Sequence, residues 1–144
     1  MKRLYSLLVL PFMALVCSYN KPDQKLSAHI NIAKLDHQKG TLFIGWFNNA
    51  NDFRTPEKAV FSKRIPVTNQ SDITIHFSDL LPGKYAIATF LDENNNFKLD
   101  KNILGIPKEK YGFSNNIFHA TKPASFYESA FTLTNDMTLK INLK

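Results

Sequence analysis

Short runs in which apolar and polar residues alternate make up most of this chain beyond its first eighteen residues. The clearest run is 72–78, where Ile73, Ile75 and Phe77 are separated by polar residues. Alternation with a period of two places the apolar side chains on one face of a β-strand. The pattern therefore predicts strands at 28–35, 41–48, 59–67, 72–78, 84–91 and 137–143, and a strand or short helix at 125–133.

Turn residues separate these runs, and no long segment has the 3.6-residue period of a helix. Several short strands at this spacing predict an all-β fold, a single-domain antiparallel β-sandwich with Greek-key connections, immunoglobulin-like or prealbumin-like. Pro66 favours an edge position for the strand at 59–67, because proline lacks the amide that a central strand needs. Trp46 and Ile75 are expected in the core.

A tyrosine follows the Pro82-Gly83 turn at the start of the strand predicted at 84–91. This arrangement is typical of the tyrosine corner of Greek-key sandwiches, in which the phenol hydroxyl bonds back to the backbone beside the turn. We therefore expect Tyr85 to be buried, with its hydroxyl bound near the turn.

The N-terminus has the layout of a secretory signal peptide. Lys2 and Arg3 precede an uncharged apolar run at 4–16, which is short for a transmembrane helix. Cleavage after Ser18 would leave a mature domain of residues 19–144, exported to the periplasm or the exterior and without a transmembrane segment. Alternatively, Cys17 would be the lipidated residue of a lipoprotein anchor. Since Cys17 is the only cysteine, an intramolecular disulfide is excluded.

Loss of Lys2 and Arg3 with the leader lowers the formal net charge from +6 to +4. The other basic residues are scattered and do not interleave with aromatic residues as in a nucleic-acid-binding surface. We therefore expect no nucleic-acid partner. A polysaccharide or protein of the cell envelope is the partner that export and a weakly basic surface suggest.

The stretch LDENNNFKLD, residues 91–100, is the strongest candidate for a binding site. Asp92, Asn94 and Asn96 stand at positions one, three and five of a calcium-loop pattern, Lys98 offers a backbone carbonyl at position seven, and Asp100 stands at position nine. Calcium takes six to eight oxygen ligands, and alternate side chains of a turning loop converge on one point. The spacing therefore predicts a calcium site.

Two departures limit the expected affinity. Phe97 occupies position six, where calcium loops of the EF-hand kind have glycine, and Ile103 occupies position twelve, where they have glutamate. The site is expected to be weak, with a dissociation constant on the order of 10⁻⁴ to 10⁻³ M. The alternative is a polar loop whose Asp and Asn side chains bond to their own backbone.

Residues 83–116 resemble the signature of a family of exported bacterial proteins, the domain of unknown function 2141 family. The matching residues are Tyr85, Asp92, Asn94, Asn96, Asp100, Gly105, Pro107, Glu109, Gly112, Phe113, Ser114, Asn115 and Asn116. Phe97 departs from the usual glycine of that signature. The resemblance implies export and a small β-sandwich, and it brings no established activity.

The block GIPKEKYGFSNN, residues 105–116, follows the acidic stretch. Glu109 is close enough in sequence to fold back and complete a calcium shell. Ser114, Asn115 and Asn116 suit either a second polar patch or a loop held together by its own side chains. A long connection of this composition is the expected functional surface.

Enzymatic chemistry has little support in the sequence. The four histidines are scattered without zinc-ligand spacing, and Ser114 lacks a nucleophile elbow. A glycosidase-like pair among the carboxylates of 92–109 has no spacing signal. We therefore expect a non-enzymatic binding or structural module with a weak calcium site. The alternatives are a metal-independent carbohydrate- or envelope-binding module and, third, a small hydrolase.

Overall fold

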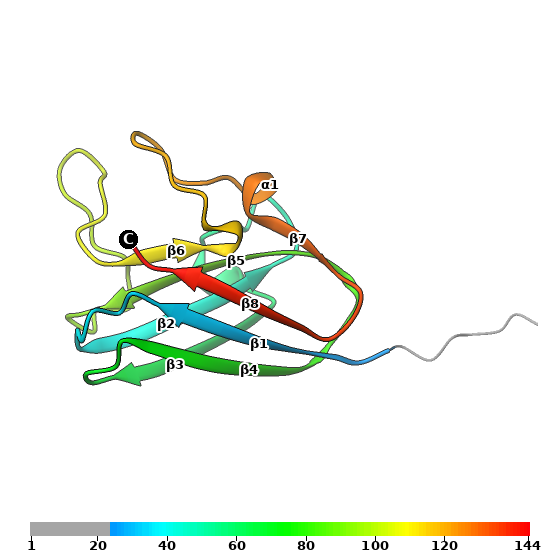
Figure 1. The fold of residues 1–144 in the computed structure, drawn as a ribbon. Coiled ribbons are helices and arrows are strands. Elements are labelled where there is room, and N and C mark those ends of the chain that lie inside the picture. Colours follow the sequence, from blue (N-terminus) through cyan, green and yellow to red (C-terminus); the bar gives the residue numbers. More distant parts are fainter. Residues whose placement is uncertain (1–23) are drawn as a thin grey trace, which may run out of the picture.

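The computed structural model describes residues 24–144, which form two β-sheets packed against each other (Figure 1). One sheet has the strand order β4-β1-β8, and the other has the order β3-β2-β5-β6 with β7 also paired to β5. The strands are β1 (Leu26–Ala33), β2 (Gly40–Phe47), β3 (Phe61–Val67), β4 (Asp72–Leu80), β5 (Gly83–Asp92), β6 (Tyr111–Phe113), β7 (Ala130–Leu133) and β8 (Met137–Asn142). Short helices are η1 (Pro56–Lys58), η2 (Ser114–Asn116) and α1 (Phe126–Ser129).

The predicted all-β sandwich is confirmed, and one pairing departs from the antiparallel expectation. β8 runs parallel to β1, whereas the other strand pairs are antiparallel. Pro66 lies on β3, at the edge of its sheet, as its missing amide requires. The Greek-key connection stays a prediction. The proposed leader, residues 1–18, lies outside the described residues.

Residues 125–133 contain both of the structures that the sequence allowed. Ser125 caps α1 in a capping box, because its hydroxyl accepts from the amide of Glu128 while the Glu128 carboxylate accepts from the Ser125 amide. The chain then extends into β7. The sequence did not predict β6, which has only three residues.

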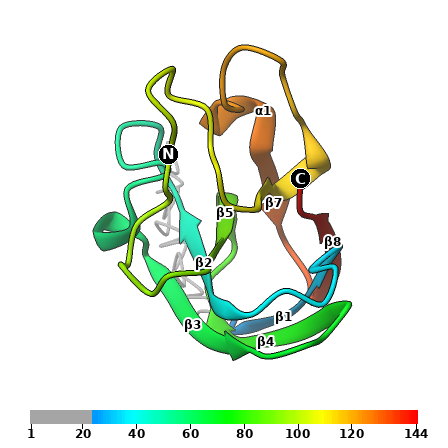
Figure 2. The ribbon, with the colours of Figure 1, turned by 90° about the vertical axis from the view of Figure 1, so that its left-hand side faces the viewer.

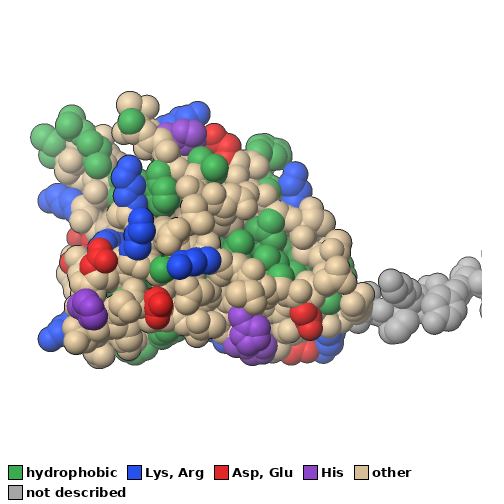
Figure 3. Space-filling model, in the orientation of Figure 1, with side chains coloured by type: hydrophobic (Ala, Val, Ile, Leu, Met, Phe, Trp, Pro, Cys, Tyr) green, Lys and Arg blue, Asp and Glu red, His purple; other side chains and the backbone are tan. Residues whose placement is uncertain are grey.

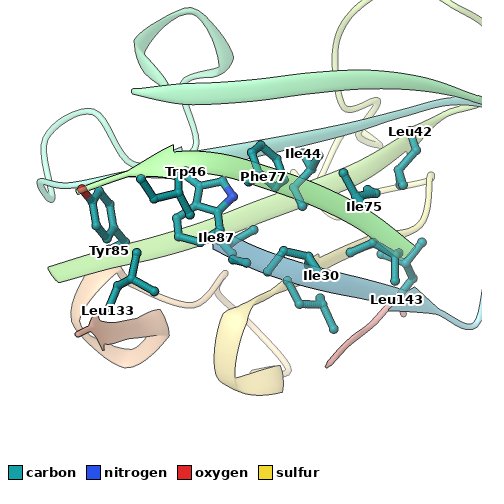
Figure 4. Packing of buried hydrophobic residues seen from close by; sticks show 14 of the residues in the cluster. Ile30, Leu42, Ile44, Trp46, Ile75, Phe77, Tyr85, Ile87, Leu133 and Leu143 are labelled. Carbon is teal, nitrogen blue, oxygen red and sulfur yellow. The ribbon is translucent and has the colours of Figure 1, made fainter. Parts of the chain in front are cut away.

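The core lies between the two sheets and is built by the alternating side chains (Figure 4). Trp46 is fully buried, and Ile75 and Tyr85 are 4% and 7% exposed, so their predicted burial is confirmed. The Trp46 ring meets Phe77 at 5.4 Å and Tyr85 at 5.6 Å between ring centroids. This aromatic contact joins the two sheets, because Phe77 comes from β4 and Trp46 from β2.

The tyrosine corner is also confirmed. The Tyr85 hydroxyl donates to the carbonyl of Leu81 at 3.0 Å, across the turn that precedes β5. Burial raises the pKa of the Tyr85 phenol. The corner therefore satisfies a backbone carbonyl at the point where the chain leaves one sheet for the other.

Replacing Tyr85 with phenylalanine should remove this hydrogen bond and little else. We expect the free energy of unfolding to fall by about 1–1.5 kcal/mol in urea denaturation, the usual contribution of such a bond. Tyr127→Phe is the matched control, because Tyr127 is 74% exposed and should unfold like the parent protein. Equal stability of the two variants would show that the corner hydrogen bond contributes nothing.

A second, smaller apolar cluster lies on the outer face of the larger sheet. Phe47 and Ala88 lie on this face, opposite to the side chains that build the main core. Phe53 and Phe126 cover them from the segment after β2 and from α1. These side chains do not cover the neighbouring part of the sheet, which lies beside the 93–110 connection.

Candidate functional site

The predicted calcium loop begins where β5 ends. Asp92 is the last residue of β5 and pairs with Thr41 of β2. The chain then leaves the sheet and returns at Tyr111 to form β6 on the other edge of β5 (Figure 1). The rigid sheet therefore fixes both ends of the connection that carries the candidate ligands.

Asp92 is fully buried, and its carboxylate organises the first turn of the loop. One oxygen accepts from the amide of Asn96 at 3.1 Å, and the other accepts from the amide of Phe97 at 2.8 Å. Each oxygen retains lone-pair capacity beyond these bonds. The carboxylate therefore fixes the first turn of the loop, and its oxygens can still accept a further bond.

The two candidate asparagines converge on Asp100. The Asn94 and Asn96 side-chain amides donate to the two oxygens of Asp100, at 2.7 Å and 2.9 Å. Their own carbonyl oxygens accept from backbone amides, that of Asn94 from Asn96 at 3.1 Å and that of Asn96 from Lys98 at 2.9 Å. One hydrogen-bonded cluster thus contains the four predicted side-chain ligands, Asp92, Asn94, Asn96 and Asp100. Lys98 lies in the same turn.

Glu109 closes the connection from its far side. The side chain is only 7% exposed. Its two oxygens accept from the amides of Glu93 and Asp100, each at 2.9 Å. Glu109 does fold back to the 92–100 stretch, and it clamps the beginning of the loop to its end.

Phe97 takes the backbone conformation that the usual glycine would favour. Its φ is +67°, in the left-handed region that costs a residue with a side chain about 1–2 kcal/mol. The ring is 60% exposed and lies under the Arg64 guanidinium at 5.0 Å, and Arg64 also contacts the Phe43 ring at 5.1 Å. The loop therefore makes the tight turn without the glycine, at a conformational cost.

Two residues that support the loop were not singled out from the sequence. Gly40 begins β2 with φ +150°, and a Cβ built on it would lie 2.4 Å from the carbonyl oxygen of Asp92. Thr41 donates its hydroxyl to the side-chain oxygen of Asn95 at 2.6 Å. The sequence predicted only a turn before β2 here. It contains no signal that residue 40 lies next to residue 92.

Ser114, Asn115 and Asn116 join strands rather than form an open polar patch. The buried Ser114 hydroxyl accepts from the Ile87 amide at 2.9 Å and also donates to the carbonyl of Ser129. Asn115 donates to two carbonyls near the start of β7. Asn116 donates to the Lys140 carbonyl at 3.0 Å and accepts from the Asn142 amide at 2.7 Å, which ties η2 to β8 of the other sheet.

The histidines lie apart from the acidic loop. His29 and His76 face each other across β1 and β4, with ring centroids 4.7 Å apart. His37 binds the Asn69 carbonyl at 2.7 Å. His119 contacts Glu128 at 2.8 Å. Bonds from the side chain and the backbone of Ser125, followed by His119, lower the pKa of Glu128 to about 2.

Within residues 24–144, no group of three or more His, Cys, Asp and Glu side chains is placed to hold a metal ion by itself. A cation site in the 92–100 loop would therefore have to draw on asparagine and backbone oxygens as well as carboxylates. This donor set excludes a zinc-like site of nitrogen and sulfur ligands and suits a hard cation such as calcium.

A family model described as "Uncharacterized protein conserved in bacteria (DUF2141)" matches residues 30–141, so the chain belongs to this bacterial family. The match covers most of both sheets and the whole 92–110 connection. No curated protein and no solved structure matched the chain. In the part of the chain that the structure describes, no helix is long and apolar enough to cross a membrane.

Proposed function

We propose that this member of the DUF2141 family is an exported, non-enzymatic binding or structural module in which a calcium ion holds the 92–100 loop. The ion would draw on side-chain oxygens of Asp92, Asn94, Asn96 and Asp100 and on the Lys98 carbonyl. Glu109 would support the site by fixing the two ends of the loop. Export through the N-terminal leader, or anchoring through Cys17, would supply the calcium-containing surroundings that a weak site needs.

The observation that carries the proposal is the pair of buried carboxylates at the base of the loop. Asp92 is fully buried and Glu109 is 7% exposed. Among the described residues neither forms an ion pair, and their partners are neutral backbone amides. Buried charges in proteins are usually paired or bound to metal ions, because desolvation of a lone charge is costly. A bound cation would supply the missing positive charge.

Calcium should therefore stabilise the folded protein by mass action. At free calcium one hundredfold above the dissociation constant, the expected gain is about 2.7 kcal/mol. For a domain of this size the gain should raise the melting temperature by roughly 5–15 °C. The measurement is thermal unfolding of residues 19–144 in chelator and in rising calcium. Asp92→Asn should abolish most of the rise, and Asp100→Asn should reduce it.

Three loop variants sharpen the experiment. Asn95→Gly keeps a positive φ at a position where Asn95 has φ +58°, and it should leave the calcium response intact because residue 95 lies between ligand positions. Phe97→Gly leaves the ligands in place and should respond to calcium like the parent protein, but it removes the cost of the left-handed turn and should raise the free energy of unfolding in chelator by about 1–2 kcal/mol. Phe97→Ala, which loses the ring but keeps that cost, should not. An identical melting curve with and without calcium would contradict the proposal.

A metal-independent module, recognising envelope carbohydrate or protein, is the second candidate. The specific observation in its favour is that the loop satisfies its own polar groups. Asn94 and Asn96 bond to Asp100, while Asp92 and Glu109 accept backbone amides. Such a loop has a defined conformation even without an ion. This candidate predicts the same stability in calcium and in chelator.

A further inference from the structure

A cleft of about 450 Å³ lies beside the acidic loop, on the outer face of the larger sheet. Its floor is apolar and aromatic, with Phe43 from β2, Ala88 and Phe90 from β5, and Tyr111 and Phe113 from β6. Cavities of about 300–1,000 Å³ with apolar linings are the usual sites for small organic ligands. The volume and the floor both suit an apolar ligand body.

Two connections form the walls of the cleft. Residues 97–107 stand on one side and residues 119–123 on the other, and both segments rise from the same side of the sandwich in two perpendicular views (Figure 1 and Figure 2). The first wall contributes Leu104 and Ile106, which are 78% and 52% exposed. Hydrophobic side chains gather near the tip of this loop with Lys and Arg side chains around them (Figure 3). The apolar lining therefore continues outward to the rim.

The charges around the cleft are strongly unequal. Arg54, Lys98, Lys101 and Lys122 line it, whereas Glu57 is the one acidic residue in the lining. None of these four cations forms an ion pair within residues 24–144. His119 also lines the cleft and is engaged with Glu128. A ligand with a negative group is favoured here, and a cationic ligand is disfavoured.

We infer that this cleft binds a small amphipathic anion, an aliphatic carboxylate whose chain lies on the aromatic floor and whose head group lies among the rim cations. The apolar floor accounts for the chain, because buried methylene groups gain free energy in proportion to area. The excess of unpaired cations accounts for the charge of the head group. The inference rests on the proposed binding role of the chain, but it does not require calcium in the neighbouring loop.

The test is a titration of residues 19–144 with hexanoate, octanoate and decanoate, each below its micelle concentration. The readout is the movement of backbone amide signals in nuclear magnetic resonance spectra, together with calorimetry. We expect shifts at Ala88, Phe90 and Tyr111, and a dissociation constant that falls about three- to fourfold with each added methylene. Octylammonium, with the same chain and the opposite charge, should bind at least tenfold more weakly than octanoate.

Matched variants locate the site. Leu104→Ser should weaken decanoate binding severalfold, whereas Leu81→Ser should not. Leu81 is also an exposed leucine, but it lies in the turn before β5, while the 93–110 connection that carries Leu104 follows the other end of that strand. The double variant Lys101→Gln with Lys122→Gln should reduce the preference for octanoate over octylammonium. Lys140→Gln, on β8 of the other sheet, should leave that preference unchanged.

The inference is overturned if decanoate causes no shifts at millimolar concentration, if octylammonium binds equally well, or if the Leu81 and Leu104 variants behave alike. Binding to vesicles of anionic phospholipid, without binding to monomeric decanoate, would also overturn it and would assign the loop tip to a membrane surface. Each titration is run in chelator and in calcium. Decanoate binding by a protein that does not bind calcium would reject the calcium loop alone. Calcium binding without decanoate binding would reject the cleft alone.

Discussion

Gly40→Ala should destabilise the protein strongly. The new Cβ would lie 2.4 Å from the Asp92 carbonyl oxygen and 2.9 Å from the Glu93 Cα, both of them backbone atoms that cannot swing aside. Residue 40 also has φ +150°, which side-chain-bearing residues rarely adopt. We expect a loss of roughly 3–5 kcal/mol in the free energy of unfolding, measured in urea.

Gly105→Ala is the control for this effect. Gly105 also has a positive φ, +78°, but a Cβ there would meet no atom within 4 Å. Its substitution should therefore cost only the backbone term, about 1–2 kcal/mol. Similar losses for the two variants would show that the close approach of residue 40 to Asp92 is relieved by movement of the loop, and that the sheet does not fix the loop's first turn.

Glu109→Gln should be the second costly change. It keeps the size of the side chain but replaces one carboxylate oxygen with an amide NH2 group, which then faces either the Glu93 amide or the Asp100 amide, donor against donor. A charge-assisted hydrogen bond is lost and a part-buried amide is left without an acceptor. We expect a loss of about 2–4 kcal/mol in the free energy of unfolding, measured in chelator.

Glu93→Gln gives the matched comparison for this clamp. It removes the same charge from the same connection, but the Glu93 side chain is exposed. Its stability should stay within about 0.5 kcal/mol of the parent protein, as for most surface changes. Equal effects of the two glutamine variants would indicate that general charge, rather than the two hydrogen bonds of Glu109, sets the stability of the loop.

The sequence predicted the sandwich because local alternation is a strong signal. The strand that contains Ile73, Ile75 and Phe77 and the corner at Tyr85 were both read from a few adjacent residues, and both are present. β6 was missed because its three residues carry no period of their own and are held by pairing with β5. The parallel pairing of β1 with β8 depends on contacts between opposite ends of the chain, which local patterns do not contain.

The candidate site was predicted in part. The spacing of Asp92, Asn94, Asn96 and Asp100 placed these side chains in one turn, and Glu109 was expected to fold back to them. The geometry behind that loop depends on long-range neighbours, since Gly40 and Thr41 support it from β2. The cleft was not predicted, because its floor comes from three strands and its cations from three separate segments.

The most direct test of the calcium-loop proposal is a calcium titration of the ¹⁵N-labelled domain, followed amide by amide. The proposal predicts saturable shifts of the amides from 93 to 100, above all Asn96 and Phe97, whose amides bond to Asp92. The dissociation constant should be on the order of 10⁻⁴ to 10⁻³ M, and Asp92→Asn should abolish the shifts. Unchanged spectra at 10 mM calcium, or shifts confined to residues outside this loop, would contradict it.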